Sequence, residues 1–128
     1  MNKVAEVVLP QGMSIKLNQA DLDDIMCAAL EGGISYWCGR VEVVDDYLAS
    51  YAHQQISRGG TLKLYDVEDD EVYELNFDKL VRGLELFLIH ENDTLIKLKQ
   101  EKLLAANIDS ICADLIVQYA LFGELVFS

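Results

Sequence analysis

The chain has 128 residues, of which 52% are hydrophobic, and its 22 acidic and 10 basic side chains give a formal net charge of −12. This length fits one domain with its own core, and the apolar content excludes a disordered chain. The charge argues against direct binding to nucleic-acid phosphate or to an anionic membrane, and no apolar run approaches the ~20 residues of a membrane span. We therefore expect a single domain over 1–128 whose partner is a basic protein surface, although acidity that serves only solubility gives the same composition.

The N-terminus and the cysteines bear on the compartment. One lysine and a short apolar run broken by Glu6 do not make a secretory signal peptide. The chain has an odd number of cysteines, and the spacings between them follow no pattern: they are Cys27, Cys38 and Cys112. This suits a reducing cytosol better than a disulfide framework. We expect a cytoplasmic protein.

The first third of the chain predicts a strand followed by a helix. Residues 3–9 are rich in β-branched side chains and end at Pro10, which favours a strand. Asn18 has the position of a helix N-cap, and apolar residues recur after it at helical spacing. These are Leu22, Ile25, Met26, Ala29 and Leu30. Gly32 and Gly33 supply the left-handed residue that commonly closes a helix, so we expect the helix to stop there.

Residues 34–44 are expected to be extended. Tyr36 and Trp37 then point to opposite faces, so at most one of them belongs to the core, and the sequence does not say which. Gly39 marks either a bulge or a close backbone approach.

Residues 45–60 predict a second helix, closed by Gly59 or Gly60. Its expected inner face consists of Tyr47, Leu48, Tyr51, Ala52 and Ile56.

A hairpin is predicted at about 61–76, because two alternating runs flank the polar residues 67–71. Leu62 and Leu64 should share one face of its first strand. A third helix is expected over 76–93, with an apolar face of Phe77, Leu80, Val81, Leu84, Phe87 and Leu88.

The C-terminal third begins with 94–106, which reads as a short strand at its start and as helix-prone afterwards. A fourth helix follows, capped near Asn107 and ended by Gly123, and 124–128 predict a terminal strand. Its inward residues are expected to be Ile108, Ile111, Cys112, Leu115, Ile116 and Tyr119. Together the elements predict a single compact α+β domain, a small antiparallel sheet packed with about four helices.

No motif for catalysis, a metal or a cofactor emerges from the sequence. The three cysteines lack a CxxC spacing, and only His53 and His90 are available to join them. Cys38 with nearby Arg40 is the one thiol worth testing as a nucleophile, but a histidine base beside it is not indicated. The glycine pairs follow predicted helices instead of preceding them, which is the wrong end of the helix dipole for phosphate. We expect a non-enzymatic protein without metal or cofactor.

Two groups of residues are candidates for binding. The acidic candidates for docking a basic protein are Asp45, Asp46, Glu68, Asp69, Asp70 and Glu71, of which the last four also read as an ordinary solvated turn. The candidates for a small anionic ligand, such as a nucleotide-like signal, are Tyr36, Trp37, Arg40 and Arg58, which offer stacking and cationic contacts.

Three stretches, "DLDDIMCAALEGGISYWCGRVEV", "YLASYAHQQISRGGTLKLYD" and "DLIVQYALFGELVF", resemble small, largely uncharacterised accessory proteins of phages and mobile elements of Gram-positive bacteria. The resemblance implies a small accessory protein that acts by binding in the cytoplasm of its bacterial host, for example as an inhibitor of a host nuclease or defence system. It carries no catalytic motif to transfer.

Three functional hypotheses follow. The first is a binding protein that occupies a basic surface of a host protein, the second is a protein that binds or sequesters a small ligand, and the third is a structural or assembly component. The sequence leaves open whether the chain forms a homo-oligomer.

Overall fold

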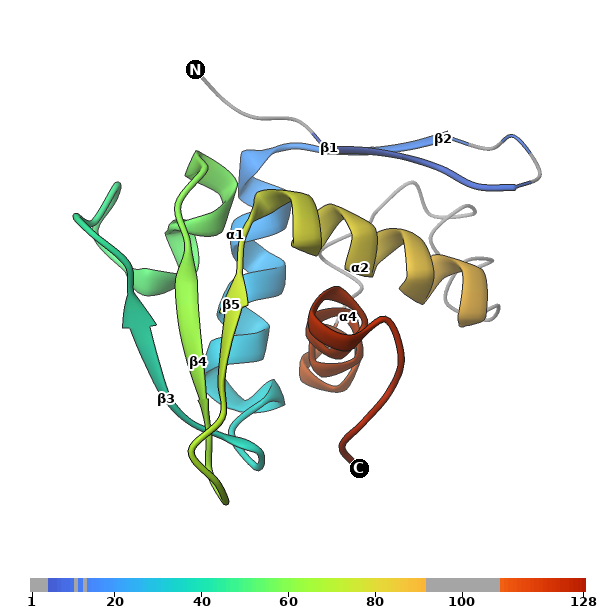
Figure 1. Cartoon of the computed structure of the whole chain (residues 1–128). Helices are drawn as coiled ribbons and strands as arrows, with labels where there is room; N and C mark the ends of the chain where they lie inside the picture. Colours follow the sequence, from blue (N-terminus) through green and yellow to red (C-terminus); the bar gives the residue numbers. More distant parts are fainter. Residues whose placement is uncertain (1–4, 11, 13, 92–108) are drawn as a thin grey trace.

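The computed structural model describes residues 5–10, 12, 14–91 and 109–128 (Figure 1). The strands are β1 (Ala5–Val8), β2 (Ser14–Leu17), β3 (Cys38–Val43), β4 (Leu62–Asp66) and β5 (Val72–Leu75). The α-helices of this part are α1 (Gln19–Ala28), α2 (Phe77–His90) and α4 (Ser110–Phe122). Shorter helical turns are the π-helix η1 (Ala29–Gly33) and the 3-10 helices η2 (Ala52–Gln54) and η3 (Ile56–Arg58). None of the helices described is long and apolar enough to cross a membrane.

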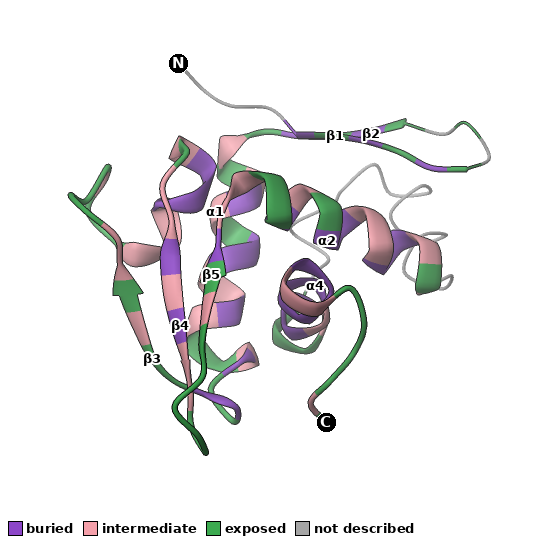
Figure 2. Ribbon diagram, in the orientation of Figure 1, coloured by how far each residue is buried: buried purple, intermediate pink, exposed green. Residues whose placement is uncertain are grey.

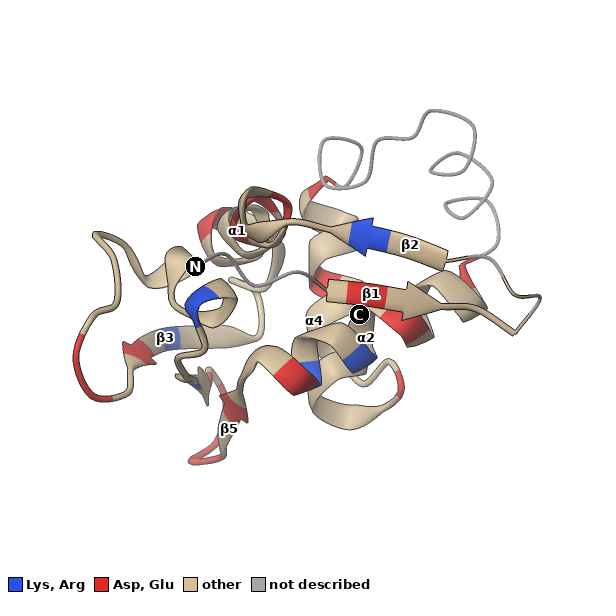
Figure 3. Cartoon of the chain, turned by 90° about the horizontal axis from the view of Figure 1, so that it is seen from above, with Lys and Arg blue, Asp and Glu red and all other residues tan. Residues whose placement is uncertain are grey.

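The strands form two antiparallel sheets. β1 pairs with β2 in a two-stranded ladder that lies over α2, and β3, β4 and β5 form a three-stranded sheet with β4 in the centre (Figures 1 and 3). The predicted hairpin at 61–76 is confirmed, and Leu62 and Leu64 of β4 are both fully buried. Figure 2 shows buried and intermediate positions alternating along β4. The fold is a single compact α+β domain, as predicted.

α1 begins where the sequence predicts. The side chain of Asn18 accepts a hydrogen bond from the Asp21 backbone N–H (2.8 Å), and the Asp21 carboxylate accepts one from the Asn18 N–H (2.9 Å). This reciprocal pair is a capping box, which satisfies two backbone donors at the helix start. The buried residues of α1 are Leu22, Ile25 and Met26, all of them predicted.

The helical run ends at Gly33, as predicted, but the predicted left-handed closure by Gly32 or Gly33 is wrong. Neither glycine has the left-handed conformation, and the helix instead widens into η1, which runs through Gly33. Gly33 is needed for another reason, because a Cβ there would overlap the carbonyl oxygen of Ser110 at the start of α4. The glycine therefore allows η1 and α4 to pack closely.

The predicted helix over 45–60 is also wrong. Only the two short turns η2 and η3 form. Three of the five residues of the expected inner face, Tyr47, Leu48 and Tyr51, are 59%, 51% and 63% exposed. Asp45 has φ +61°, a left-handed conformation that a residue within a right-handed helix does not adopt. Ile56 is buried as predicted, and Gly59 at φ +90° closes the segment.

Among the described elements, α2 and α4 make the most extensive contact. Gly83 permits this approach, since a Cβ there would come within 2.6 Å of the Ile116 carbonyl oxygen. Ile111, predicted to point inward, is 70% exposed, because it lies about 140° from Ile116 around the helix axis. The side chain of Asp109 caps α4 and Gly123 ends it at φ +74°, whereas Asn107, Ile108 and the segment 94–106 lie outside the described residues.

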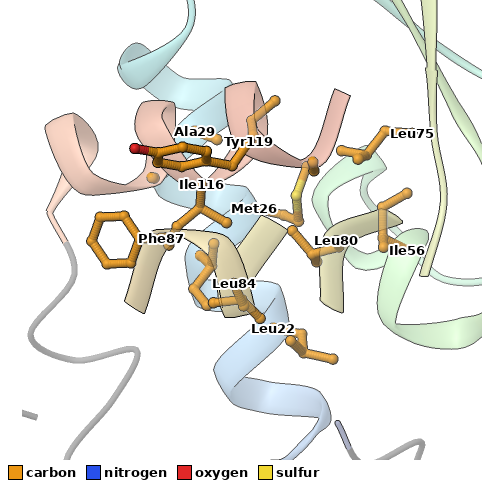
Figure 4. Packing of buried hydrophobic residues seen from close by; sticks show 14 of the residues in the cluster. Leu22, Met26, Ala29, Ile56, Leu75, Leu80, Leu84, Phe87, Ile116 and Tyr119 are labelled. Atoms are coloured by element: carbon orange, nitrogen blue, oxygen red, sulfur yellow. The ribbon is translucent and has the colours of Figure 1, made fainter. Parts of the chain in front are cut away.

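One hydrophobic core joins these layers. Figure 4 shows Met26 of α1, Leu80 and Phe87 of α2, and Ile116 and Tyr119 of α4 converging between the helices. Ile56 of η3 and Leu75 of β5 extend the core toward the three-stranded sheet. The sheet is thereby fixed to the helices, while both of its ends remain at the surface.

Candidate functional site

Trp37 is the aromatic residue that enters the core. Residues 34–37 form a turn instead of the predicted extended run, with the Trp37 N–H donating to the Ile34 carbonyl (3.0 Å). The Trp37 side chain is 2% exposed, whereas that of Tyr36 is 47% exposed. The strand then starts at Cys38, and the ladder shifts register between Cys38 and Arg40, which makes Gly39 the site of a bulge.

Both aromatic residues donate hydrogen bonds to one buried carboxylate. Asp114 of α4 is 6% exposed and accepts from Trp37 Nε1–H (2.7 Å) and from the Tyr36 hydroxyl (2.7 Å). Gln118, one helical turn later, donates to the same carboxylate (3.0 Å). Burial, followed by the hydrogen bond to Asp114, raises the pKa of Tyr36 to about 12. These bonds tie the turn before β3 to α4.

The C-terminal residues 124–128 are held by the same network. They form no strand, contrary to the prediction, because the amide oxygen of Gln118 accepts from the N–H groups of both Val126 and Phe127 (2.8 Å each). The Phe127 ring stacks on Trp37 with 4.8 Å between centroids and 5° between planes. A side chain of α4 therefore takes the place of a partner strand.

The sequence alone did not single out Asp114 and Gln118. Their signal is a polar pair at i and i+4 within the apolar run "DLIVQYALF" of α4. A helix that is apolar on nearly all sides has no solvated face for such a pair, so burial with partners is the expectation. The partners themselves come from residues about 80 positions earlier, and no local pattern identifies them.

A surface hollow of about 340 Å³ lies between the hairpin and the C-terminal residues. It is lined by Tyr36, Trp37, Asp66, Val67, Glu68, Val126, Phe127 and Ser128. Its described lining thus combines aromatic rings with two carboxylates and contains no lysine or arginine. Such a lining suits a cationic group that has an apolar stem.

The hairpin turn beside this hollow is ordered by its own side chains. Asp66 accepts from the Glu68 N–H (2.9 Å) and from the Tyr73 hydroxyl (2.8 Å), and Asp69 accepts from the Glu71 N–H (2.9 Å). The two hydrogen bonds that Asp66 accepts lower its pKa, and the bond from the Glu68 N–H has the larger effect. Burial, followed by the bond to Asp66, raises the pKa of Tyr73 to about 12. The four acidic residues of the turn are exposed, and none of them forms an ion pair within the described part of the chain.

The six predicted acidic residues do not form one patch. Asp45 and Asp46 follow the end of β3 that pairs with Leu62, whereas the hairpin turn lies at the end that pairs with Asp66. The two ends are separated by five strand positions, about 17 Å. Figure 3 shows the two acidic groups apart, one in the loop after β3 and one at the tip of the β4–β5 hairpin.

The four predicted ligand-binding residues are not brought together either. Tyr36 and Trp37 line the hollow, but neither arginine does. The Arg40 guanidinium lies 3.8 Å above the Tyr65 ring and 3.7 Å from the Glu42 carboxylate. Arg58 pairs with Asp23 of α1 (3.2 Å), so its charge is neutralised within the fold.

The contacts of Cys38 and Cys27 do not activate their thiols. Cys38 is buried and its thiol donates to the Arg40 carbonyl (3.3 Å), so Arg40 approaches it through a backbone oxygen. Burial raises the pKa of both Cys38 and Cys27, which keeps the thiols protonated at neutral pH. In the described part of the chain no three His, Cys, Asp or Glu side chains gather as metal ligands.

Comparison of the chain with protein-family models, with curated proteins and with solved structures found no match. The resemblance to accessory proteins of phages and mobile elements therefore stays a prediction.

Proposed function

We propose that this chain is a non-enzymatic binding protein, encoded by a phage or mobile element, whose hairpin end occupies a basic surface of a host protein in the cytoplasm. A nuclease or another defence protein is the kind of partner that fits, since such proteins carry basic grooves for nucleic acid. The observation that carries the proposal is the exposed acidic turn Glu68–Glu71, which forms no ion pair with any described residue and adjoins the hollow between the hairpin and the C-terminal residues.

The two parts of this end have complementary roles. The turn carboxylates supply long-range attraction to a basic surface, which raises the rate of association at low salt. The hollow offers Asp66 and Glu68 for the head of a partner lysine or arginine, and the Tyr36 and Phe127 rings for its stem.

The hairpin end is also rigid before any partner arrives. The Val67 N–H donates to the Trp37 carbonyl (2.8 Å), and Trp37 is fixed by Asp114. Because the turn and the hollow are already ordered, little conformational entropy is lost on binding. No described contact favours the small-ligand or the assembly hypothesis to the same degree, because the two arginines that would hold an anion lie outside the hollow.

Affinity purification from a Gram-positive bacterial lysate tests the proposal, with salt elution of the bound proteins. The wild-type chain is compared with the variant E68Q/D69N/D70N/E71Q. We expect a specific partner to elute from the wild type at moderate salt, since exposed charges are screened within ~8 Å at physiological ionic strength, and to be absent from the variant.

A matched control removes the same amount of charge elsewhere, at residues that do not line the hollow: E6Q/D24N/E31Q/E91Q. It should retain the partner. A partner that elutes at the same salt from all three chains, or that stays bound at high salt, contradicts the electrostatic proposal.

A further inference from the structure

The loop at the other end of the three-stranded sheet exposes large apolar side chains. Tyr47, Leu48 and Tyr51 lie within five residues and are 59%, 51% and 63% exposed. The Tyr51 ring stacks on His53 with 5.5 Å between centroids. Exposed tyrosines and aliphatic side chains grouped in this way are typical of protein interfaces.

The loop is held in place by a residue beneath it. Gln55 is 1% exposed, its amide oxygen accepts from the Leu48 N–H (3.0 Å), and its amide nitrogen donates to the Asp46 carbonyl (3.0 Å). Gly60 leaves room for this side chain, because a Cβ at Gly60 would come within 2.6 Å of Gln55 Cγ. The exposed side chains therefore stand on a fixed backbone.

A hollow of about 330 Å³ opens beside these side chains. It is lined by Val44, Asp45, Asp46, Leu48, Gln55, Gly59, Gly60 and Thr61. The described lining holds two carboxylates and no cation, next to the aliphatic side chains of Val44 and Leu48. An extended cationic side chain matches both parts, with its methylene stem on Leu48 and its charged head at the carboxylates.

We propose that the loop Asp45–Tyr51 is a second protein-docking surface, which takes an arginine or lysine of a partner into this hollow while Tyr47 and Tyr51 pack on apolar residues beside it. Charge complementarity selects this occupant. A second copy of the chain would place its own Asp45 and Asp46 carboxylates against the same two carboxylates, and each copy carries a net charge of −12, so the two copies would repel each other. The inference goes beyond the function proposed for the hairpin end and is independent of it, because the two surfaces lie at opposite ends of the sheet.

Tripeptide probes test the cationic contact and the apolar contact separately. The ¹⁵N-labelled full chain is titrated with acetyl-Leu-Arg-Leu-amide, with the same peptide carrying norleucine in place of arginine, and with acetyl-Gly-Arg-Gly-amide. The first should shift the amide resonances of Leu48, Gly59, Gly60 and Thr61, and each of the other two should bind about fivefold more weakly, as expected from the loss of one cationic or apolar contact.

Variants locate the binding. D45N/D46N should lose the preference for arginine while keeping the backbone, because asparagine tolerates the left-handed conformation. Y47S/Y51S should lose the preference for leucine. The hairpin variant E68Q/D69N/D70N/E71Q should bind the first peptide as the wild type does, which distinguishes this surface from the one proposed above.

Three results would overturn the inference. They are the absence of any shift at the four amides, equal binding of the arginine and norleucine peptides, and shifts confined to the hairpin turn. Shifts of the same amides that depend on protein concentration without peptide would replace the basic partner with a second copy of the chain.

Discussion

The hairpin turn at one end of the three-stranded sheet and the Asp45–Tyr51 loop at the other end are both acidic, yet they are ordered in different ways. The hairpin turn is held by its own neighbours, since Asp66 and Asp69 each accept a backbone N–H two residues later. The loop is held by Gln55, a buried side chain seven residues beyond Leu48. A turn conformation that is held by hydrogen bonds within the turn can be predicted from its sequence. A loop conformation that is held by a buried side chain outside the loop cannot.

The largest expected effect concerns the support under the hairpin end. Asp114→Ala removes the acceptor shared by Tyr36, Trp37 and Gln118. Leaving buried donors unpaired should lower the free energy of unfolding by about 3 kcal/mol, measured by urea denaturation. Native-state hydrogen exchange should quicken at the amides of Val67 and Phe127 more than at Leu48.

The control for this variant is Ile111→Ala, which alters a 70% exposed residue on the same helix and should change stability by less than about 0.5 kcal/mol. An equal loss of protection at Leu48 would show that the two ends form one cooperative unit, and would remove the contrast between them.

A smaller effect is expected for the support under the loop. Gln55→Ala leaves the Leu48 N–H and the Asp46 carbonyl without their partner, which should lower the free energy of unfolding by about 2 kcal/mol. Exchange should quicken at Leu48 and stay unchanged at Glu68 and Glu71. The matched variant Gln54→Ala loses only an exposed acceptor of the Tyr51 N–H and should cost less than about 1 kcal/mol. Equal losses from both variants would contradict the role given to Gln55.

Alkaline pH should weaken the hairpin end selectively. The pKa values of Tyr36 and Tyr73 in the folded protein are raised to about 12, above the ordinary tyrosine value of about 10. The stability linked to their protonated hydroxyls is therefore complete below pH ~10 and is lost as pH rises toward about 12. Urea denaturation at several pH values should show this decline, with a flatter profile for the variant Y36F/Y73F. Identical profiles for the two proteins would refute the linkage.

The smallest effect concerns the backbone of the loop. Asp45 has φ +61°, and Asp45→Gly should raise the free energy of unfolding by about 0.5 kcal/mol, because relief of the left-handed strain exceeds the added chain entropy of glycine. Thermal denaturation measures the gain. A destabilised variant would mean that the Asp45 side chain stabilises the folded loop by more than its left-handed backbone costs.

Sequence reasoning succeeded where the cause of a structure is local. The capping residue Asn18, the β4–β5 hairpin and the closing glycines Gly59 and Gly123 all depend on neighbours within a few positions. So does the apolar face of α2, of whose six predicted residues four are buried. It was wrong for Tyr47, Leu48 and Tyr51, because their helical spacing matches an inner face while Asp45 and Gln55 hold the backbone in another conformation. It also left open the choice between Tyr36 and Trp37.

By itself, then, the sequence determined the α+β class, the helix and strand boundaries that rest on caps and turns, and the acidic character of the surface. Only the tertiary structure decided that Asp114 and Gln118 bind the turn at Trp37 and the C-terminal residues, and that the six acidic residues divide into two surfaces. The reason is physical: capping and hairpin formation satisfy nearby backbone groups, whereas the partner of a buried polar side chain is set by which distant elements pack together.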